Sequence, residues 1–206
     1  MARVPLTIEQ AKVSKLVLHA GSVRLTPEQF FRLCRDNPDL RLELTAQKEI
    51  VIMPPCNSET GWKEGEILGQ LRDWAKRDGT GFAFGSSAGF TLPNSAVRGP
   101  DACWVRREKW KALKPEQRRA FSPICPDFVI ELRSPNDTLA ELNEKMAEYI
   151  ANGAQLGWVI DPIGRTVVVH RPGSLPQRLD GPETLSGDPV LAGFVLDLAE
   201  IWQGPV

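Results

Sequence analysis

The segment 126–137, with the sequence PDFVIELRSPND, constrains the fold more than any other stretch of the chain. Its centre, 128–130, is a continuous apolar run, which is typical of a strand buried on both faces. An amphipathic helix follows over 138–152, with Asp137 expected as its N-cap. A second apolar strand is predicted at 156–160. This strand–helix–strand order indicates a βαβ unit, and therefore some parallel pairing.

Other parts of the chain predict antiparallel pairing. Residues 40–54 alternate in polarity on either side of a short polar turn, as in a β-hairpin, and 165–170 is expected to pair back on the strand at 156–160. Helices are predicted at 26–37 and 58–76. A mixed sheet flanked by helices, with extra hairpins, satisfies both patterns, so the predicted fold class is α/β.

The predicted domain organisation is an N-terminal arm and one domain. Residues 1–24 are weakly periodic and form the arm, with a short strand at 15–18 that could pack on another subunit. Residues 25–206 are long enough for one domain with a substantial core. The tail of this domain is rich in Pro and Gly and is expected to be poor in strands, apart from an edge strand or dimer contact at 194–198.

The formal net charge of −1 gives no overall basic character, so positive charge that meets nucleic acid must be local. Four cysteines without a CxxC pair, and only two histidines, disfavour a structural zinc site. With no signal peptide, the cysteines are expected to be reduced thiols in the cytoplasm. No apolar run approaches the ~20 residues of a membrane span, so no membrane partner is expected.

Two carboxylates stand next to strands that are expected to be buried, and a lysine follows on the next helix. Asp101 begins the short strand at 101–105, and Glu131 follows the apolar run at 128–130 and ends its strand. Lys145 lies at the edge of the apolar stripe of its helix, from where its amine can lean towards the end of the sheet. Carboxylate and backbone oxygens suit Mg²⁺, and a desolvated lysine whose pKa falls could help to activate water.

Each of these residues also has a purely structural interpretation. Asp101 could be a turn acid, Glu131 an ion-pair partner of Arg133, and Lys145 a helical partner of Glu141. Glu43 alternates with apolar residues in its strand, and on residue type it is expected to be solvated and paired with Arg41 or Lys48.

The connection between the strand at 101–105 and the segment at 126–137 is the most basic part of the chain. Its positive side chains make it the best candidate for a surface that meets phosphates. A solvated helical face is the alternative. The predicted nucleic-acid contacts are Arg133 and, in this connection, Arg106, Arg107 and Lys109.

Five motifs in order carry a resemblance to a known family: LELTAQKEIVIMPP, PDACWV, CPDFVIELRSPND, EKMAEYIANGAQLGWVID and RTVVVHRPG. Over 25–202 the chain closely resembles the Uma-two family, a restriction-endonuclease-like group of the PD-(D/E)xK nuclease superfamily. The resemblance implies a restriction-endonuclease-like core. It also implies a DNA endonuclease that requires Mg²⁺ or Mn²⁺, with DNA as partner, a homodimeric assembly and no nucleotide cofactor.

The resemblance assigns the catalytic set to Glu43, Asp101, Glu131 and Lys145. Asp101, Glu131 and Glu43 would be the metal ligands, and Lys145 would position the attacking water or the phosphate. The superfamily's usual lysine position, two residues after the second acid, is Arg133 here, and arginine cannot act as a base. Alternative functions are a catalytically silent nuclease fold that binds nucleic acid or serves in assembly, and a metal-dependent hydrolase of small phosphoesters.

Overall fold

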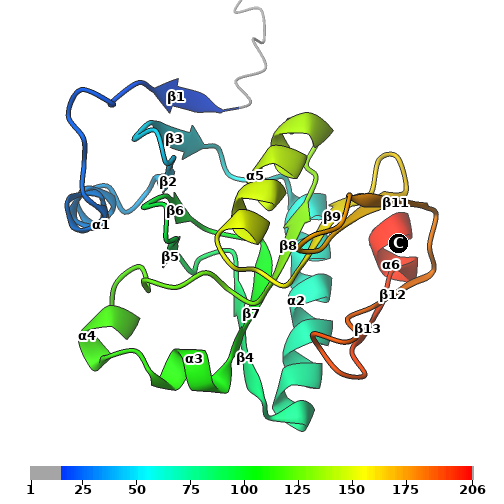
Figure 1. The fold of residues 1–206 in the computed structure, drawn as a ribbon. Helices are drawn as coiled ribbons and strands as arrows, with labels where there is room; N and C mark the ends of the chain where they lie inside the picture. Colours follow the sequence, from blue (N-terminus) through cyan, green and yellow to red (C-terminus); the bar gives the residue numbers. More distant parts are fainter. Residues whose placement is uncertain (1–14, 206) are drawn as a thin grey trace, which may run out of the picture.

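The computed structural model describes residues 15–205 of the 206-residue chain (Figure 1). The helices are α1 (Pro27–Asp36), α2 (Ser58–Asp78), α3 (Arg107–Lys111), α4 (Pro115–Arg118), α5 (Leu139–Ala151) and α6 (Ala199–Gln203). The strands are β1 (Leu16–Leu18), β2 (Arg41–Leu44), β3 (Ile50–Met53), β4 (Gly81–Gly85), β5 (Phe90–Thr91), β6 (Val97–Arg98), β7 (Ala102–Arg106), β8 (Phe128–Leu132), β9 (Leu156–Asp161), β10 (Thr166–His170), β11 (Gln177–Asp180), β12 (Thr184–Ser186) and β13 (Val195–Asp197).

The central sheet has six strands in the order β11-β10-β9-β8-β7-β4. Strands β8 and β9 pair in parallel and are joined by α5, whereas every other neighbouring pair in this sheet is antiparallel. The predicted βαβ unit and the mixed sheet are therefore confirmed. All five residues of β8 are buried, as its continuous apolar sequence predicted.

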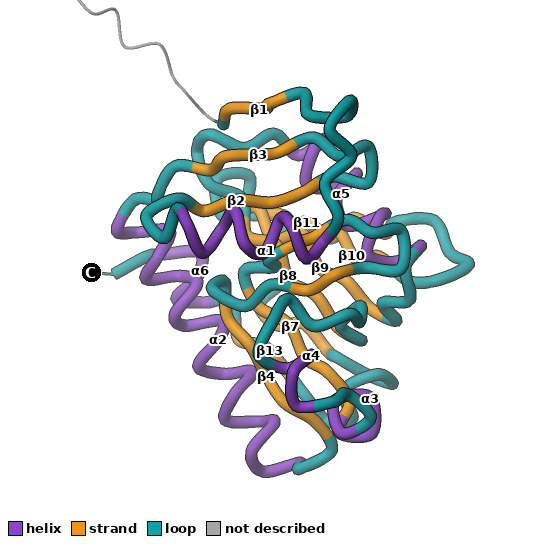
Figure 2. The backbone as a smooth tube through the Cα atoms, turned by 90° about the vertical axis from the view of Figure 1, so that its left-hand side faces the viewer, coloured by secondary structure: helices purple, strands orange, loops and turns teal. Residues whose placement is uncertain are grey.

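A second sheet has the order β1-β3-β2-β6-β5 and lies beside the central one (Figure 2). The predicted hairpin is its β2–β3 pair. In the described part of the arm, β1 pairs with β3 of the same chain, while residues 1–14 lie outside the described residues. Strands β2 and β6 touch only through Leu44 and Val97, so the two strands diverge towards Arg41.

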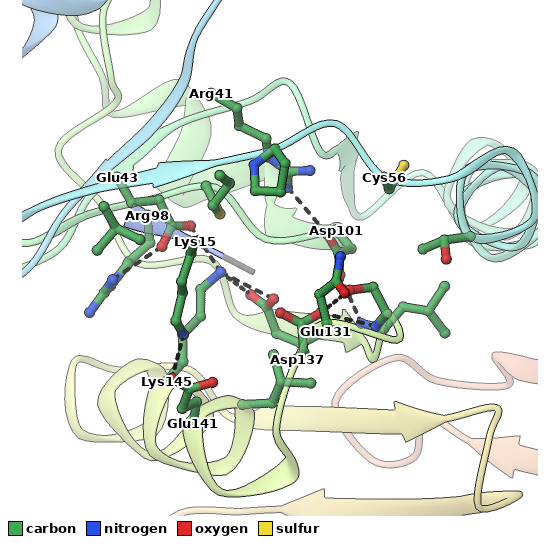
Figure 3. A pocket seen from close by; sticks show the side chains of 18 of the residues that line it. Lys15, Arg41, Glu43, Cys56, Arg98, Asp101, Glu131, Asp137, Glu141 and Lys145 are labelled. Carbon is green, nitrogen blue, oxygen red and sulfur yellow. Dashed lines mark hydrogen bonds and ion pairs between the residues drawn. The ribbon is translucent and has the colours of Figure 1, made fainter. Parts of the chain in front are cut away.

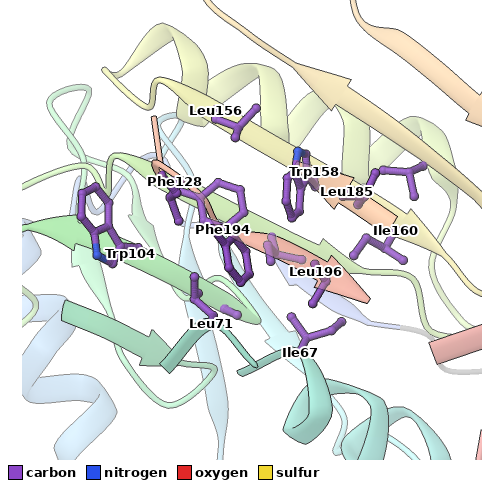
Figure 4. Packing of buried hydrophobic residues seen from close by; sticks show 14 of the residues in the cluster. Ile67, Leu71, Trp104, Phe128, Leu156, Trp158, Ile160, Leu185, Phe194 and Leu196 are labelled. Carbon is purple, nitrogen blue, oxygen red and sulfur yellow. The ribbon is translucent and has the colours of Figure 1, made fainter. Parts of the chain in front are cut away.

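Helices cover both faces of the central sheet because the side chains of its strands alternate between the faces. Phe128 and Ile130 of β8 pack with α2 and the C-terminal segment in one apolar cluster (Figure 4). Val129 points to the opposite face, where it joins Met146 and Tyr149 of α5. The side chains of the candidate site lie at the edges of this layered core.

Two local predictions were wrong. Thr138, not Asp137, caps α5, because its hydroxyl accepts a hydrogen bond from the Glu141 amide. Asp137 instead accepts from the Ser134 amide, which closes the preceding turn. The tail is also not poor in strands, since β11, β12 and β13 lie within it.

The segment predicted as an edge strand or dimer contact packs inward. Phe194, Leu196 and Leu198 are almost fully buried and belong to the apolar cluster under α2. The intervening Val195 and Asp197 are exposed. The apolar side chains of this segment therefore cover the core of this chain and do not form an exposed apolar face.

Gly157 allows α5 to lie close to the sheet. A Cβ atom at this position of β9 would stand 2.1 Å from Sδ of the buried Met146 on α5. We expect Gly157→Ala to lower the free energy of unfolding by about 1–3 kcal/mol, the usual cost of overpacking. Gly65→Ala is the matched control in α2, where a Cβ meets nothing within 4 Å, and it should add about 0.5–1 kcal/mol. Urea unfolding of both variants measures the difference, and equal stabilities would contradict close packing at Gly157.

Candidate active site

The four residues of the predicted catalytic set line one cavity of about 690 Å³ (Figure 3). Glu43 comes from β2, Asp101 from the residue before β7, Glu131 from β8 and Lys145 from α5. The strand alternation that buries Leu44 on the far side of β2 turns Glu43 towards this cavity. The set is therefore assembled from both sheets and one helix.

Lys145 lies at the centre of the set. Its Nζ is 2.9 Å from Oε1 of Glu43 and 3.0 Å from Oε1 of Glu131, and it donates a hydrogen bond of 3.1 Å to Oε2 of Glu131. The buried stripe Leu142, Met146 and Tyr149 fixes α5 on the sheet and leaves Lys145 at the stripe's edge. Its amine reaches the end of β8, as the helical periodicity predicted.

Asp101 is bound to the same strand end by another route. Its Oδ2 accepts a hydrogen bond of 2.8 Å from the Leu132 amide, and its Oδ1 accepts one of 3.2 Å from Arg41. Because β7 and β8 are antiparallel with Ala102 opposite Ile130, Asp101 comes opposite Glu131 and within reach of the Leu132 amide. The carboxylate of Asp101 is thus held in place at the cavity wall, so Asp101 is not a free turn acid. Its carboxylate forms no ion pair with Lys145.

Glu43 is buried, with 3% of its surface exposed, so its interpretation as a solvated residue was wrong. Its Oε1 accepts a hydrogen bond of 2.9 Å from the Gly99 amide, and its Oε2 accepts one of 3.1 Å from Arg98. Neither Arg41 nor Lys48 is its partner: Arg41 binds Asp101, and Lys48 donates to the Ser95 carbonyl.

Arg98 and Glu148 were missed by the reasoning from sequence. Arg98 joins Glu43 to Glu148, to which its Nε donates a hydrogen bond of 2.6 Å. Glu148 follows Lys145 by three residues on α5, so both face the cavity. This i, i+3 spacing was a usable signal, whereas nothing local to Arg98 in the sequence indicates its role.

Burial and neighbouring charges set the protonation of the three central groups. Burial alone would raise the pKa of Glu43, but Lys145 and Arg98 lower it to about 2. Burial, together with the charges of Asp101 and Glu43, raises the pKa of Glu131 to about 8, against the opposing effect of Lys145. Glu131 therefore exchanges a proton near neutral pH, and burial also raises the pKa of Asp101.

The expectation of a lowered lysine pKa was wrong. Burial does lower the pKa of Lys145, but the charges of Glu131, Glu43 and Asp101 outweigh it and raise the pKa above its usual value. Lys145 is an ammonium ion across the physiological range, so it can orient and neutralise oxygens, but it does not serve as a base.

The carboxylate oxygens of the cavity are of the type that binds a hard divalent cation, but they do not converge on one point. Oε1 of Glu131 is buried and accepts no hydrogen bond, its contact with Lys145 being an ion pair without hydrogen-bond alignment. Carboxylates are the ligands that Mg²⁺ and Mn²⁺ prefer. Among residues 15–205, however, no three His, Cys, Asp or Glu side chains are arranged as ligands of one ion.

The four predicted nucleic-acid contacts do not line this cavity. Arg133 pairs with Asp161 at 3.0 Å and donates to the Asp137 carbonyl. It therefore turns away from the place where a lysine at that position would act.

The other three predicted contacts lie around α3, on a different part of the surface. Lys109 binds Asp127 at 2.8 Å, and Arg106 lies 3.6 Å from the same carboxylate. Arg107 donates to the Gly79 carbonyl and covers the ring of Phe82. Their contact with nucleic acid stays a prediction.

Comparisons with known proteins agree with this architecture. The model of the family Uma2, described as "Putative restriction endonuclease", matches residues 27–199. A solved structure from Anabaena variabilis ATCC 29413, described as a putative nuclease belonging to DUF820, has a TM-score of 0.72 and 22% identity, over 87% of this chain and 98% of that one. At this identity the likeness shows the shared fold. No curated protein matches the chain.

The described helices also bear on the membrane question. Within residues 15–205, none combines the length and the apolar character that a membrane span requires.

Proposed function

Because this chain belongs to the Uma2 family of restriction-endonuclease-like proteins, we propose that it hydrolyses phosphodiester bonds of DNA in the cavity around Lys145. One observation carries the proposal: the buried carboxylates of Glu43 and Glu131 converge on one buried ammonium ion, Lys145, in a cavity that Asp101 also lines. Buried ion clusters of this kind seldom stabilise a fold more than apolar residues would, so the cluster points to a chemical role.

Asp101 and Glu131, with the carbonyl of Leu132, would hold Mg²⁺ or Mn²⁺, and Glu43 would bind a second ion or a water. When bound, the ion would polarise the phosphate and lower the pKa of a water molecule. Glu131 must lose its proton to become a ligand, so ion binding releases a proton and strengthens as the pH rises towards about 8.

Lys145 would position the scissile phosphate. As an ammonium ion with Glu43 and Glu131 as partners, it places a positive charge at the wall of the cavity. With Glu131 serving as a metal ligand, the amine of Lys145 would be free to donate to a phosphate oxygen instead. A carboxylate of the cavity would accept the proton of the water, since Lys145 stays charged and cannot accept it.

A second candidate is a catalytically silent nuclease fold that binds nucleic acid or serves in assembly. The ion pairs favour it: Glu43 is paired with Lys145 and Arg98, and Glu131 with Lys145, so both buried carboxylates have a basic partner within the protein. The two functions differ in whether any DNA is cut when Mg²⁺ or Mn²⁺ is supplied.

The test is cleavage of circular single-stranded DNA and of supercoiled double-stranded DNA. Mg²⁺ or Mn²⁺ is supplied at roughly 5 mM, which is chosen to saturate a weak Mg²⁺ site. We expect cleavage by the wild type, none with EDTA, and a loss of about a thousandfold in Asp101→Asn, corresponding to several kcal/mol of lost charge stabilisation. Asp180→Asn, at an exposed acid that does not line the cavity, is the control. Intact DNA under every metal condition, with the protein folded, would favour the silent module.

The assembly and the location remain predictions from the sequence. A homodimer, which would present two sites to two strands, is tested by sedimentation of the full chain. The cytoplasmic location is tested by fractionation of the cells that produce the protein.

A further inference from the structure

The divergence of β2 from β6 opens a second cavity behind the candidate active site. The strands pair only at Leu44 and Val97, and beyond this point the side chain of Glu43 bridges the gap to the Gly99 amide. A cavity of about 440 Å³ lies at this gap, and its lining includes both Glu43 and Gly99.

The two cavities share a wall. Arg41, Glu43, Met53 and Arg98 line both of them. Glu43 is also 2.9 Å from the amine of Lys145, so the second cavity begins one side chain away from the proposed reaction centre. A group that occupies it would be attached close to the bond under attack.

The lining of the second cavity suits a flat, partly polar group. Its apolar part includes Leu40, Leu42 and Phe121, and the ring of Phe121 is held edge-on by Phe31 at 5.1 Å. Hydroxyls come from Ser86 and Ser87, in a turn closed by the hydrogen bond from the Ala88 amide to the Gly85 carbonyl. Four charged side chains complete the lining, and the volume of the cavity lies within the range of small-ligand sites.

We propose that this cavity binds the base of the nucleotide next to the scissile phosphate, and that the substrate is therefore a strand with unpaired nucleotides. The proposal rests on the proposed function and adds its substrate class. A base inside a duplex cannot enter a cavity, and extruding it costs a few kcal/mol, whereas a base in a single strand is free to enter.

The charges of the active-site cavity favour the same substrate class. Among the described residues that line it, nine are carboxylates and four are basic. Duplex-binding proteins neutralise many phosphates with Lys and Arg. This lining instead suits one or two phosphates held next to bound cations, with further affinity supplied by a base.

The test compares two oligomers with the same phosphates. Binding of octathymidylate and of an eight-unit abasic (tetrahydrofuran) oligomer is measured by fluorescence anisotropy with Ca²⁺, which is chosen to hold the oligomer without cleavage. We expect the wild type to bind octathymidylate about tenfold more tightly, in line with the stacking of one base. Ser87→Trp, which fills the second cavity from an exposed turn position, should bind both oligomers equally.

Controls separate the base site from folding and from the proposed function. Ser174→Trp, at an exposed serine that lines neither cavity, should keep the tenfold preference, and thermal unfolding should show both variants folded. Equal binding of both oligomers by the wild type, or an unchanged preference in Ser87→Trp, would overturn the base site and leave the nuclease proposal standing. Failure of the wild type to bind either oligomer would also overturn the base site, whereas the nuclease proposal is decided separately by the cleavage of circular and supercoiled DNA.

Discussion

Replacing Glu131 with glutamine is expected to abolish metal-dependent cleavage and to make the folded protein more stable at pH 8. The loss of activity follows from removing a charged ligand, and about a thousandfold is expected. The gain in stability follows from burial, since 2% of Glu131 is exposed and its pKa is raised from 4.5 to about 8. The wild type must bury this charge as the pH rises, and the variant need not.

The sign of the pH dependence follows from linkage. Between pH 4.5 and about 8 the folded protein holds a proton on Glu131 that the unfolded chain has released. The contribution of Glu131 to the free energy of unfolding is therefore fully present below pH 4.5 and is lost as the pH rises through about 8. In urea unfolding at pH 5 and pH 8, the wild type should lose on the order of 1–4 kcal/mol that Glu131→Gln does not lose.

Glu200→Gln, at an exposed position of α6, is the control and should follow the wild type at both pH values. Parallel pH profiles for the wild type and Glu131→Gln would contradict the raised pKa. This result would be independent of whether the protein cuts DNA.

Replacing Lys145 with methionine should cost about 3–5 kcal/mol of unfolding free energy, because removing one partner leaves buried charge without compensation. Glu43, with its pKa near 2, keeps Arg98 but loses the amine at 2.9 Å. Glu131 loses its only basic partner among the described residues. Cleavage should also fall to background, because no positive charge remains to position the phosphate.

Two further variants separate charge from geometry. Lys145→Arg keeps the charge and should recover most of the stability but not the cleavage, because a planar guanidinium cannot take the place of a compact ammonium. The double variant Lys145→Met with Glu43→Gln should recover 0.5–3 kcal/mol, a coupling typical of residues in contact. If Lys145→Met unfolds at the same urea concentration as the wild type, the ion cluster does not stabilise the fold.

The sequence predicted those parts of the site that depend on local periodicity. The apolar run of β8 placed Glu131 at a buried strand, and the helical stripe of α5 placed Lys145 at its edge. Glu43 was harder, because alternation gives the face of a strand but does not reveal what covers that face. Its burial comes from α5 and Arg98, which are distant in sequence.

Other features depended on tertiary contacts without a local pattern. Arg98 lies in a two-residue strand, and its two glutamate partners are 55 and 50 residues away in the chain. The strands of the tail are three or four residues long between turns, too short for a clear alternation. The basic residues around α3 gave a strong charge pattern, but the carboxylate of Asp127 and backbone carbonyls account for several of them.

The close packing of Met146 on Gly157 has a consequence for the evolution of such a site. A lysine two residues after Glu131 would be tied to that acid by the backbone itself, so it would survive any change that kept the strand. The position of Lys145 instead depends on how α5 packs on β9. A single core substitution that shifts α5 could therefore abolish the proposed DNA hydrolysis, with every acid of the site unchanged. A second substitution in the core could restore it.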